Sequence, residues 1–218
     1  MRFLCKKLVM RLVILADESF KEEILSHETK ETNIIWTENA EEFIRYKNAD
    51  GFIDLLFDNS IQRIELLKKI SLNPIIINSV ITTLKETKVP FVRVNAWPGF
   101  LTRPVAEASY SNENIKGQAE KIFSWLNRRV EWVADKPGFI TARVIAMIIN
   151  EAYFALEEGV STKEEIDTAM KLGTNYPYGP FEWAKKIGLK NIYLLLDKLH
   201  KTNPRYEPAA ILKKEAKT

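Results

Sequence analysis

Cysteine and histidine are scarce in this sequence. Cys5 is the only cysteine, so no disulfide can form within the chain and no cluster of thiolates can hold a metal. The two histidines, His27 and His200, lie far apart in the sequence. These shortages exclude a metal centre built from cysteine or histidine, and we expect no bound metal.

Net charge and long apolar runs are also lacking. The 32 lysines and arginines nearly balance the 29 aspartates and glutamates, which leaves a net charge of +3 and argues against a nucleic-acid partner. The first apolar run, residues 12–16, ends at Asp17 and is too short for a signal sequence or a membrane span. We therefore expect a cytoplasmic protein with no membrane partner, starting at Met1 or at Met10.

What the sequence does contain is an alternation of short β-prone runs with helical patterns. Such alternation favours βαβ units and a mostly parallel sheet. The expected strands are 12–16, 33–36, 51–57, 74–78, 90–95 and 128–133. The expected helices are 19–26, 39–46, 60–70 and 112–126, the first three opened by Ser19, Asn39 and Ser60 as N-caps.

The chain becomes purely helical after the Pro-Gly pair at 137–138, which is a natural boundary between a domain at 1–134 and a second domain at 135–218. A long apolar helix is expected over 139–158, followed by Gly159. Ser161 and Glu164 form an S-x-x-E capping box for a helix over 162–172 that ends at Gly173. A third amphipathic segment, 181–189, follows a turn rich in proline.

The motifs of this region carry a resemblance. The order P-G-F-I-x-x-R, N-E-A, E-E-G-V-S, E-E-I-D-x-A-M-K-L-G and Y-P-x-G-P-F-E covers residues 137–182. It resembles the C-terminal domain of 3-hydroxyacyl-CoA dehydrogenases. The resemblance implies an α/β fold: a Rossmann-like parallel sheet domain, here shortened, followed by an all-α C-terminal domain. Because only one helix fits before Asn33, we expect the second strand of the usual sheet to be absent.

The cofactor implied by the family is NAD, whose pyrophosphate needs a glycine-rich turn after the first strand. No glycine precedes Gly51. The resemblance places the three glycine positions at Ala16, Glu18 and Lys21, and Asp17 adds a further negative charge there. We therefore expect no cofactor to bind, and we assign no cofactor-binding residues.

The catalytic pair implied by the family is a histidine base oriented by a glutamate twelve residues later. Asn95 and Glu107 fall on these two positions. An amide cannot act as a general base near neutral pH, although it can hydrogen-bond to the glutamate. Asn78 and Ser79 fall on substrate-binding positions, whereas Ala142 stands where the family carries an asparagine that contacts the substrate carbonyl.

Three functions stay open. The first is a degenerate family member that acts as a binding or partner protein, with acyl-CoA as a possible ligand. The second is an active dehydrogenase with an atypical cofactor mode, and the third is a structural subunit of an active paralogue. In each case the apolar arc of helix 139–158 is wider than one packing face requires, so we expect a homodimer through the helical domain. The Arg128-Arg129 pair has two readings, a contact with an anionic CoA or a solvated turn, and we expect the solvated turn.

Overall fold

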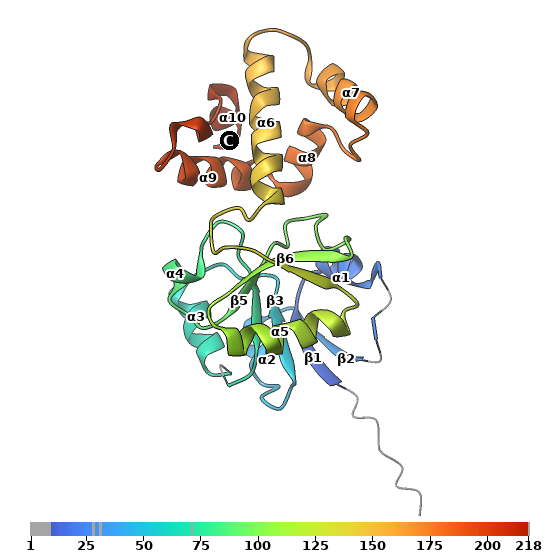
Figure 1. The fold of residues 1–218 in the computed structure, drawn as a ribbon, viewed down its shortest axis with the longest axis vertical. Coiled ribbons are helices and arrows are strands. Elements are labelled where there is room, and N and C mark those ends of the chain that lie inside the picture. The colour runs from blue at the N-terminus through green and yellow to red at the C-terminus, as the bar shows by residue number, and fades with distance from the viewer. Residues whose placement is uncertain (1–9, 28, 31, 71, 218) are drawn as a thin grey trace, which may run out of the picture. The chain divides into compact units, whose positions relative to one another are not determined.

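The computed structural model describes residues 10–27, 29–30, 32–70 and 72–217, and it divides the chain into two compact units. The first unit comprises residues 10–96 and 100–135 (Figure 1). The second comprises residues 97–99 and 136–217. Each unit has its own arrangement of secondary structure and is described separately.

The first unit is built on a sheet of seven strands in the order β2-β1-β3-β4-β5-β6-β7. All neighbours pair in parallel except β5 and β6, which are antiparallel. The strands are β1 (Met10–Leu15), β2 (Thr32–Thr37), β3 (Gly51–Asp54), β4 (Ile75–Asn78), β5 (Val92–Val94), β6 (Val105–Tyr110) and β7 (Arg129–Trp132). The expected α/β fold with a mostly parallel sheet is confirmed.

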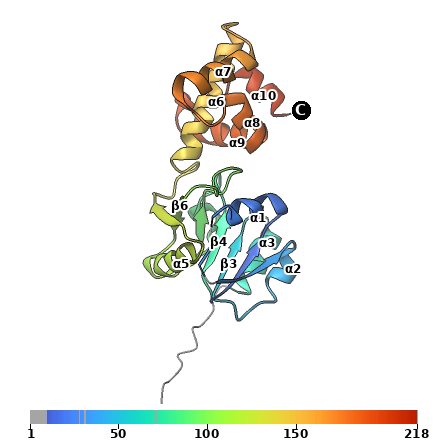
Figure 2. The same cartoon turned by 90° about the vertical axis from the view of Figure 1, so that its right-hand side faces the viewer.

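Helices cover both faces of this sheet, which explains why the central strands are apolar on both sides. Leu12 and Ile14 of β1 belong to one core, together with residues of α1 (Glu18–Leu25) and α5 (Glu113–Trp125). Val13 and Leu15 belong to the other core, with residues of three short helices, two of which are labelled in Figure 2. Those helices are α2 (Ala40–Phe43), α3 (Ile61–Lys68) and α4 (Leu84–Thr87).

Four details of the first unit differ from expectation. The second strand is present, because β2 pairs in parallel with β1 on the side opposite β3. In the doubly wound order 3-2-1-4-5-6, the place that no strand of the described residues fills is the third, beyond β2. Strand β6 was not expected, and the expected strand 51–57 ends at Asp54. Helix α1 is capped by Asp17, whose side chain accepts from Phe20 N, and not by Ser19.

The second unit is all-helical, with α6 (Thr141–Glu157) packed against α8, α9 and α10. Its other elements are α7 (Lys163–Thr174), α8 (Pro180–Ile187), α9 (Leu189–His200), a short 3-10 helix (Pro204–Tyr206) and α10 (Ala210–Glu215). Among the residues that the structure describes, no helix is long and apolar enough to cross a membrane.

The start and the end of α7 are each shifted from the sequence prediction. The capping box is formed by Thr162 and Glu165, one residue later than expected. Gly173 lies inside the helix, and Asn175 ends it in the left-handed conformation with φ of 54°. An asparagine tolerates this conformation through local hydrogen bonding, so it replaces glycine as the stop signal.

Candidate functional site

Asn95 and Glu107 meet where the resemblance places a catalytic pair. Strands β5 and β6 pair in register, with Val94 opposite Ala108, which brings the next residues together. The Asn95 side-chain amide donates to Glu107 Oε2 at 3.0 Å, and the Asn95 backbone N–H donates to the Glu107 carbonyl at 2.9 Å. Asn95 is buried, whereas Glu107 is half-buried. The bond orients an amide against a carboxylate, and neither of these two side chains carries a basic nitrogen.

Asn78 lies beside this pair, at the carboxyl end of β4. Its amide group donates to the carbonyls of Leu55 and Ala96, each at 3.2 Å, and its oxygen accepts from Ala96 N at 3.3 Å. The side chain thus joins the segments that follow β3 and β5. These three bonds go to the protein's own backbone, so the observed role of Asn78 is to fix the edge of the sheet next to Asn95.

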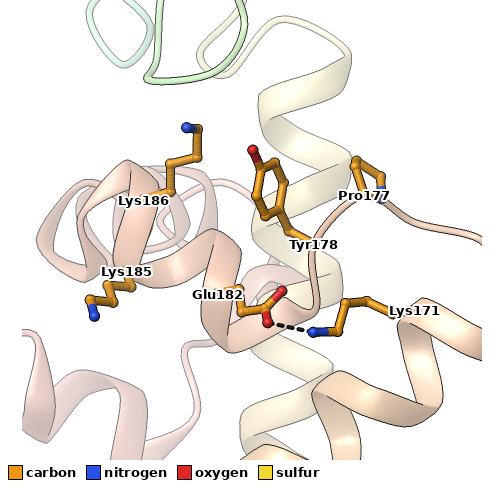
Figure 3. Close-up of a pocket in the computed structure, with 6 residues that line it drawn as sticks. All are labelled: Lys171, Pro177, Tyr178, Glu182, Lys185 and Lys186. Carbon is orange, nitrogen blue, oxygen red and sulfur yellow. Dashed lines mark hydrogen bonds and ion pairs between the residues drawn. The ribbon is translucent and has the colours of Figure 1, made fainter. Parts of the chain in front are cut away.

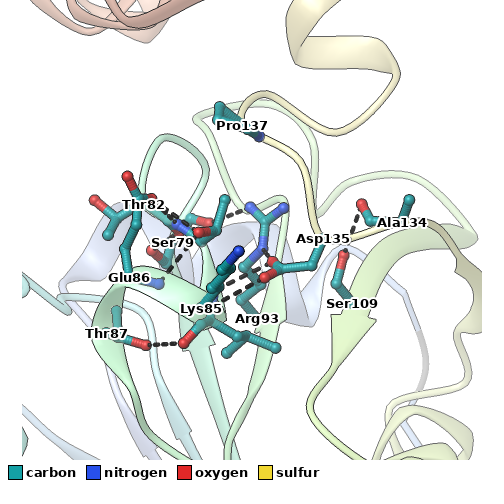
Figure 4. Close-up of polar contacts among 12 residues, drawn as sticks. Ser79, Thr82, Lys85, Glu86, Thr87, Arg93, Ser109, Ala134, Asp135 and Pro137 are labelled. Carbon is teal, nitrogen blue, oxygen red and sulfur yellow. Dashed lines mark hydrogen bonds and ion pairs between the residues drawn. The ribbon is translucent and has the colours of Figure 1, made fainter.

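Ser79 belongs to a separate polar network built around Arg93 (Figure 4). The Ser79 hydroxyl donates to the carbonyl of Thr82 at 2.8 Å, within its own loop. The Ser79 carbonyl accepts from the Arg93 guanidinium at 2.9 Å. Asp135 accepts from Arg93 Nε at 2.6 Å and from Leu84 N at 3.2 Å. The network therefore ties the loop after β4 and the start of α4 to the segment after β7.

Two buried arginines were not identified from the sequence. Arg93 lies in the run V-R-V with no exposed surface, and burial lowers the pKa of its guanidinium despite the Asp135 charge. Arg128, expected on a solvated turn, is also buried and donates to backbone carbonyls, among them Leu101 at 2.8 Å and Leu126 at 2.9 Å. A buried cation is stable only when its donors are satisfied, which sequence spacing does not reveal.

The turn after β1, where a dinucleotide phosphate would bind in this fold, is filled by the chain itself. Asp17 Oδ1 accepts from Phe20 N at 2.9 Å, so a carboxylate already lies at the N-terminus of α1. Glu18 is exposed in the same turn and pairs with Lys21 at 3.2 Å. A helix N-terminus attracts one anion, and a second would be repelled by Asp17 and Glu18. The residues present do not fit the pyrophosphate of NAD.

Asp54 is a buried carboxyl group whose pKa lies well above its usual range. It ends β3 with no exposed surface, and burial raises the pKa of its carboxyl to about 7, against the opposing charge of Arg63. Its Oδ1 accepts from Leu56 N at 3.1 Å, while Oδ2 lies 3.6 Å from Arg63 Nε without a hydrogen bond. Sequence reasoning did not single out Asp54, because its burial depends on the covering helices.

Comparison with known proteins identifies the helical unit. The sequence model described as 3-hydroxyacyl-CoA dehydrogenase, C-terminal domain, matches residues 138–218. The chain therefore carries a C-terminal domain of the 3-hydroxyacyl-CoA dehydrogenase type. It is 40% identical to 3-hydroxyadipyl-CoA dehydrogenase of Escherichia coli over 114 residues, which are 51% of this chain and 24% of the relative. It is 35% identical to a probable 3-hydroxybutyryl-CoA dehydrogenase of Bacillus subtilis over 117 residues, 53% of this chain and 39% of the relative.

Solved structures extend the likeness of fold to both units. The (S)-3-hydroxybutyryl-CoA dehydrogenase of Ralstonia eutropha matches 94% of this chain and 93% of its own, with a TM-score of 0.77 and 18% identity. The 3-hydroxybutyryl-CoA dehydrogenase of Escherichia coli K12 matches 65% of this chain and 31% of its own, with a TM-score of 0.57 and 33% identity. The first unit is therefore Rossmann-like in fold. The chain matches less than half the length of either curated relative.

Proposed function

We propose that this chain is a family member that does not transfer hydride and acts as a binding or partner protein for an acyl-CoA-type ligand. The observation that carries the proposal is the hydrogen bond between Asn95 and Glu107 at 3.0 Å. It keeps the geometry of an oriented pair but places an amide where a base is required. Loss of a general base costs about 10²–10⁴-fold in rate. Ala142, fully buried in α6, offers no polar contact to a substrate carbonyl.

The turn after β1, where a nucleotide cofactor would bind, supports the same proposal. Asp17 caps α1, and Glu18 lies exposed in the same turn. The cofactor would therefore lose the backbone contacts that this fold normally gives a pyrophosphate. This argument does not apply to an acyl-CoA ligand, because its binding does not require that turn.

The experiment is a pair of measurements on the purified chain with acetoacetyl-CoA. Titration calorimetry is expected to give saturable binding. A spectrophotometric assay with NADH is expected to give no turnover. A rate on the order of 1–10³ per second, ordinary for an enzyme, would contradict the proposal. The variant Asn95→His is a sharper control: it is expected to stay inactive, and turnover in this variant would reveal a working NADH site.

A structural subunit is the second candidate, and one observation favours it. Ile140 and Val144, one turn apart at the start of α6, are each about half exposed. Such a stripe fits pairing of the helical unit with a second copy or with an active paralogue. Detection of a stable complex with a second, catalytically competent chain would favour this candidate over the first.

A further inference from the structure

The helical unit carries a pocket of about 640 Å³ between α7, the loop at 175–179 and α8. It lies wholly within the second unit and plays no part in the Asn95–Glu107 pair. Figure 3 shows the side chains that line it, contributed by all three segments. They are Lys171, Pro177, Tyr178, Glu182, Lys185 and Lys186.

The charge of this pocket is positive, with three lysines and one carboxylate. The carboxylate is fully engaged: Glu182 Oε1 accepts from Lys171 Nζ at 2.5 Å, and Oε2 accepts from Gly179 N at 2.9 Å. These bonds, that from Lys171 first, lower the pKa of Glu182 and keep it ionised. Lys185 and Lys186 are exposed and have no carboxylate within ion-pair distance in the described part of the chain.

Lysines in the last turn of a helix suit its dipole, and this alone explains many of them. The Lys186 side chain, however, is also held by two contacts. Its stem packs on Gly99, where an added Cβ would lie 2.7 Å from Lys186 Cε. Its ammonium lies 5.3 Å from the centre of the Tyr178 ring. In Figure 3 the Lys186 and Tyr178 side chains extend side by side, while Lys185 projects away from the ring.

Tyr178 supplies an aromatic wall that is held in place. Its ring meets the ring of Trp183 edge-on, with centroids 4.8 Å apart and planes at 72°. Trp183 is buried, so Tyr178 is supported from the interior of the unit. Tyr178 itself is 37% exposed, between Pro177 and Gly179 in the chain. The fixed Tyr178 ring can stack on a flat ring of a ligand, and the Lys186 ammonium beside it can pair with a phosphate of the same ligand.

We propose that this pocket binds a nucleotide with a terminal phosphate group, either a free nucleoside diphosphate or the nucleotide end of CoA. Lys186, aided by Lys185, contacts the phosphate, and the Tyr178 ring contacts the base. NAD is not of this class, because both of its phosphates bridge two nucleosides and carry one charge each. The inference does not rest on the proposed function, since it concerns the helical unit alone.

The test is titration calorimetry of the full chain with ADP and with adenosine. ADP is expected to saturate the protein, and adenosine is expected to bind at least tenfold more weakly, a difference of about 1.4 kcal/mol. The double variant Lys185→Glu with Lys186→Glu is expected to bind ADP at least tenfold more weakly than the wild type. The matched control is Lys190→Glu with Lys213→Glu, which makes the same charge change on exposed lysines outside the pocket.

Two more measurements complete the experiment. Lys186→Met keeps the packed stem and removes the charge, so weaker ADP binding in this variant reports the ammonium even if the double variant fails to fold. Competition of CoA with bound ADP assigns the nucleotide end of CoA as the ligand, and lack of competition assigns a free nucleotide. The proposal is overturned if ADP does not saturate the wild type, or if the control variant loses as much affinity for ADP as the pocket variant does.

Discussion

The carboxylate of Asp167 on α7 lies against the Cα atom of Gly179, so close that a methyl group at position 179 would overlap it. Asp167 is 9% exposed and accepts from Phe181 N at 2.8 Å and from Glu182 N at 3.2 Å. These are amides of the first turn of α8, whose N-cap residue, Gly179, has no side chain to accept from them. Gly179 is therefore required for close approach, although its φ of −72° suits any residue.

Asp167→Ala is expected to lower the free energy of unfolding by about 1–2 kcal/mol, as loss of a helix cap does elsewhere. Gly179→Ala is expected to destabilise as well, through the steric overlap. Urea denaturation at neutral pH measures both. The control is Glu164→Ala, an exposed acid in the first turn of α7. Equal losses in Asp167→Ala and the control would show that Asp167 acts only as a surface charge.

This contact illustrates what the sequence does and does not reveal. The motifs around Asp167 and Gly179 carry the resemblance to the family, but their spacing gives no sign that the two residues touch. Helix ends were predictable where the cap is local, as at Asn39, Ser60 and Asn112. The cap of α8 comes from fourteen residues away, beyond the reach of a local pattern.

The sheet shows the same division between local and distant causes. Central strands such as β1 are short apolar runs, and this local pattern is enough to predict a strand. Strand β6 reads V-A-E-A-S-Y, with weak β-propensity, and it is ordered by pairing with β5 and β7. The contact between Asn95 and Glu107 followed from the resemblance, whereas the Arg93 network depends on tertiary neighbours that no motif records.

NADH is expected not to bind in the micromolar range, because the carboxylate of Asp17 already caps α1. The variant Ala16→Gly with Glu18→Gly is also expected not to bind, since Asp17 remains in place. Titration calorimetry with NADH checks both proteins. A saturable isotherm for the wild type at micromolar NADH would contradict the argument. Saturation by the variant alone would assign the block to the Ala16 and Glu18 side chains.

Asp54 is expected to make stability depend on pH. Its carboxyl has a pKa of about 7 in the folded chain against 3.8 as the reference value, so the folded state holds a proton that the unfolded state releases. The unfolding free energy should therefore fall as pH rises from about 4 to about 7, by a few kcal/mol at most. Urea denaturation at pH 5 and pH 8 measures this loss.

Asp54→Asn is expected to remove that part of the pH dependence, because an amide keeps the acceptor for Leu56 N and does not ionise. Asp58→Asn is the control: this carboxyl is mostly exposed, and a hydrogen bond from the Ser60 backbone lowers its pKa, so its effect has the opposite sign. If Asp54→Asn loses stability between pH 5 and pH 8 as the wild type does, then Asp54 is not the group responsible.

The last prediction concerns assembly through α6. One side of this helix is buried within its own unit, with Ala142, Ala146 and Ile149 fully covered. On the other side Ile140 is 53% exposed and Val144 is 52% exposed. An apolar stripe of this kind is stable in water when a second subunit covers it, and two-fold pairing is the commonest way to do so. We therefore expect a homodimer that buries on the order of 2,000 Å².

Ile140→Glu with Val144→Glu is expected to yield monomers, because a dimer interface there would bury four unpaired carboxylates. Light scattering at micromolar concentration measures the particle mass. The control is Leu172→Glu, on a residue that is 83% exposed at the end of α7, and it should remain dimeric. A wild-type particle of single-chain mass would refute the dimer. A dimer that survives both glutamates would place the interface on a surface other than the start of α6.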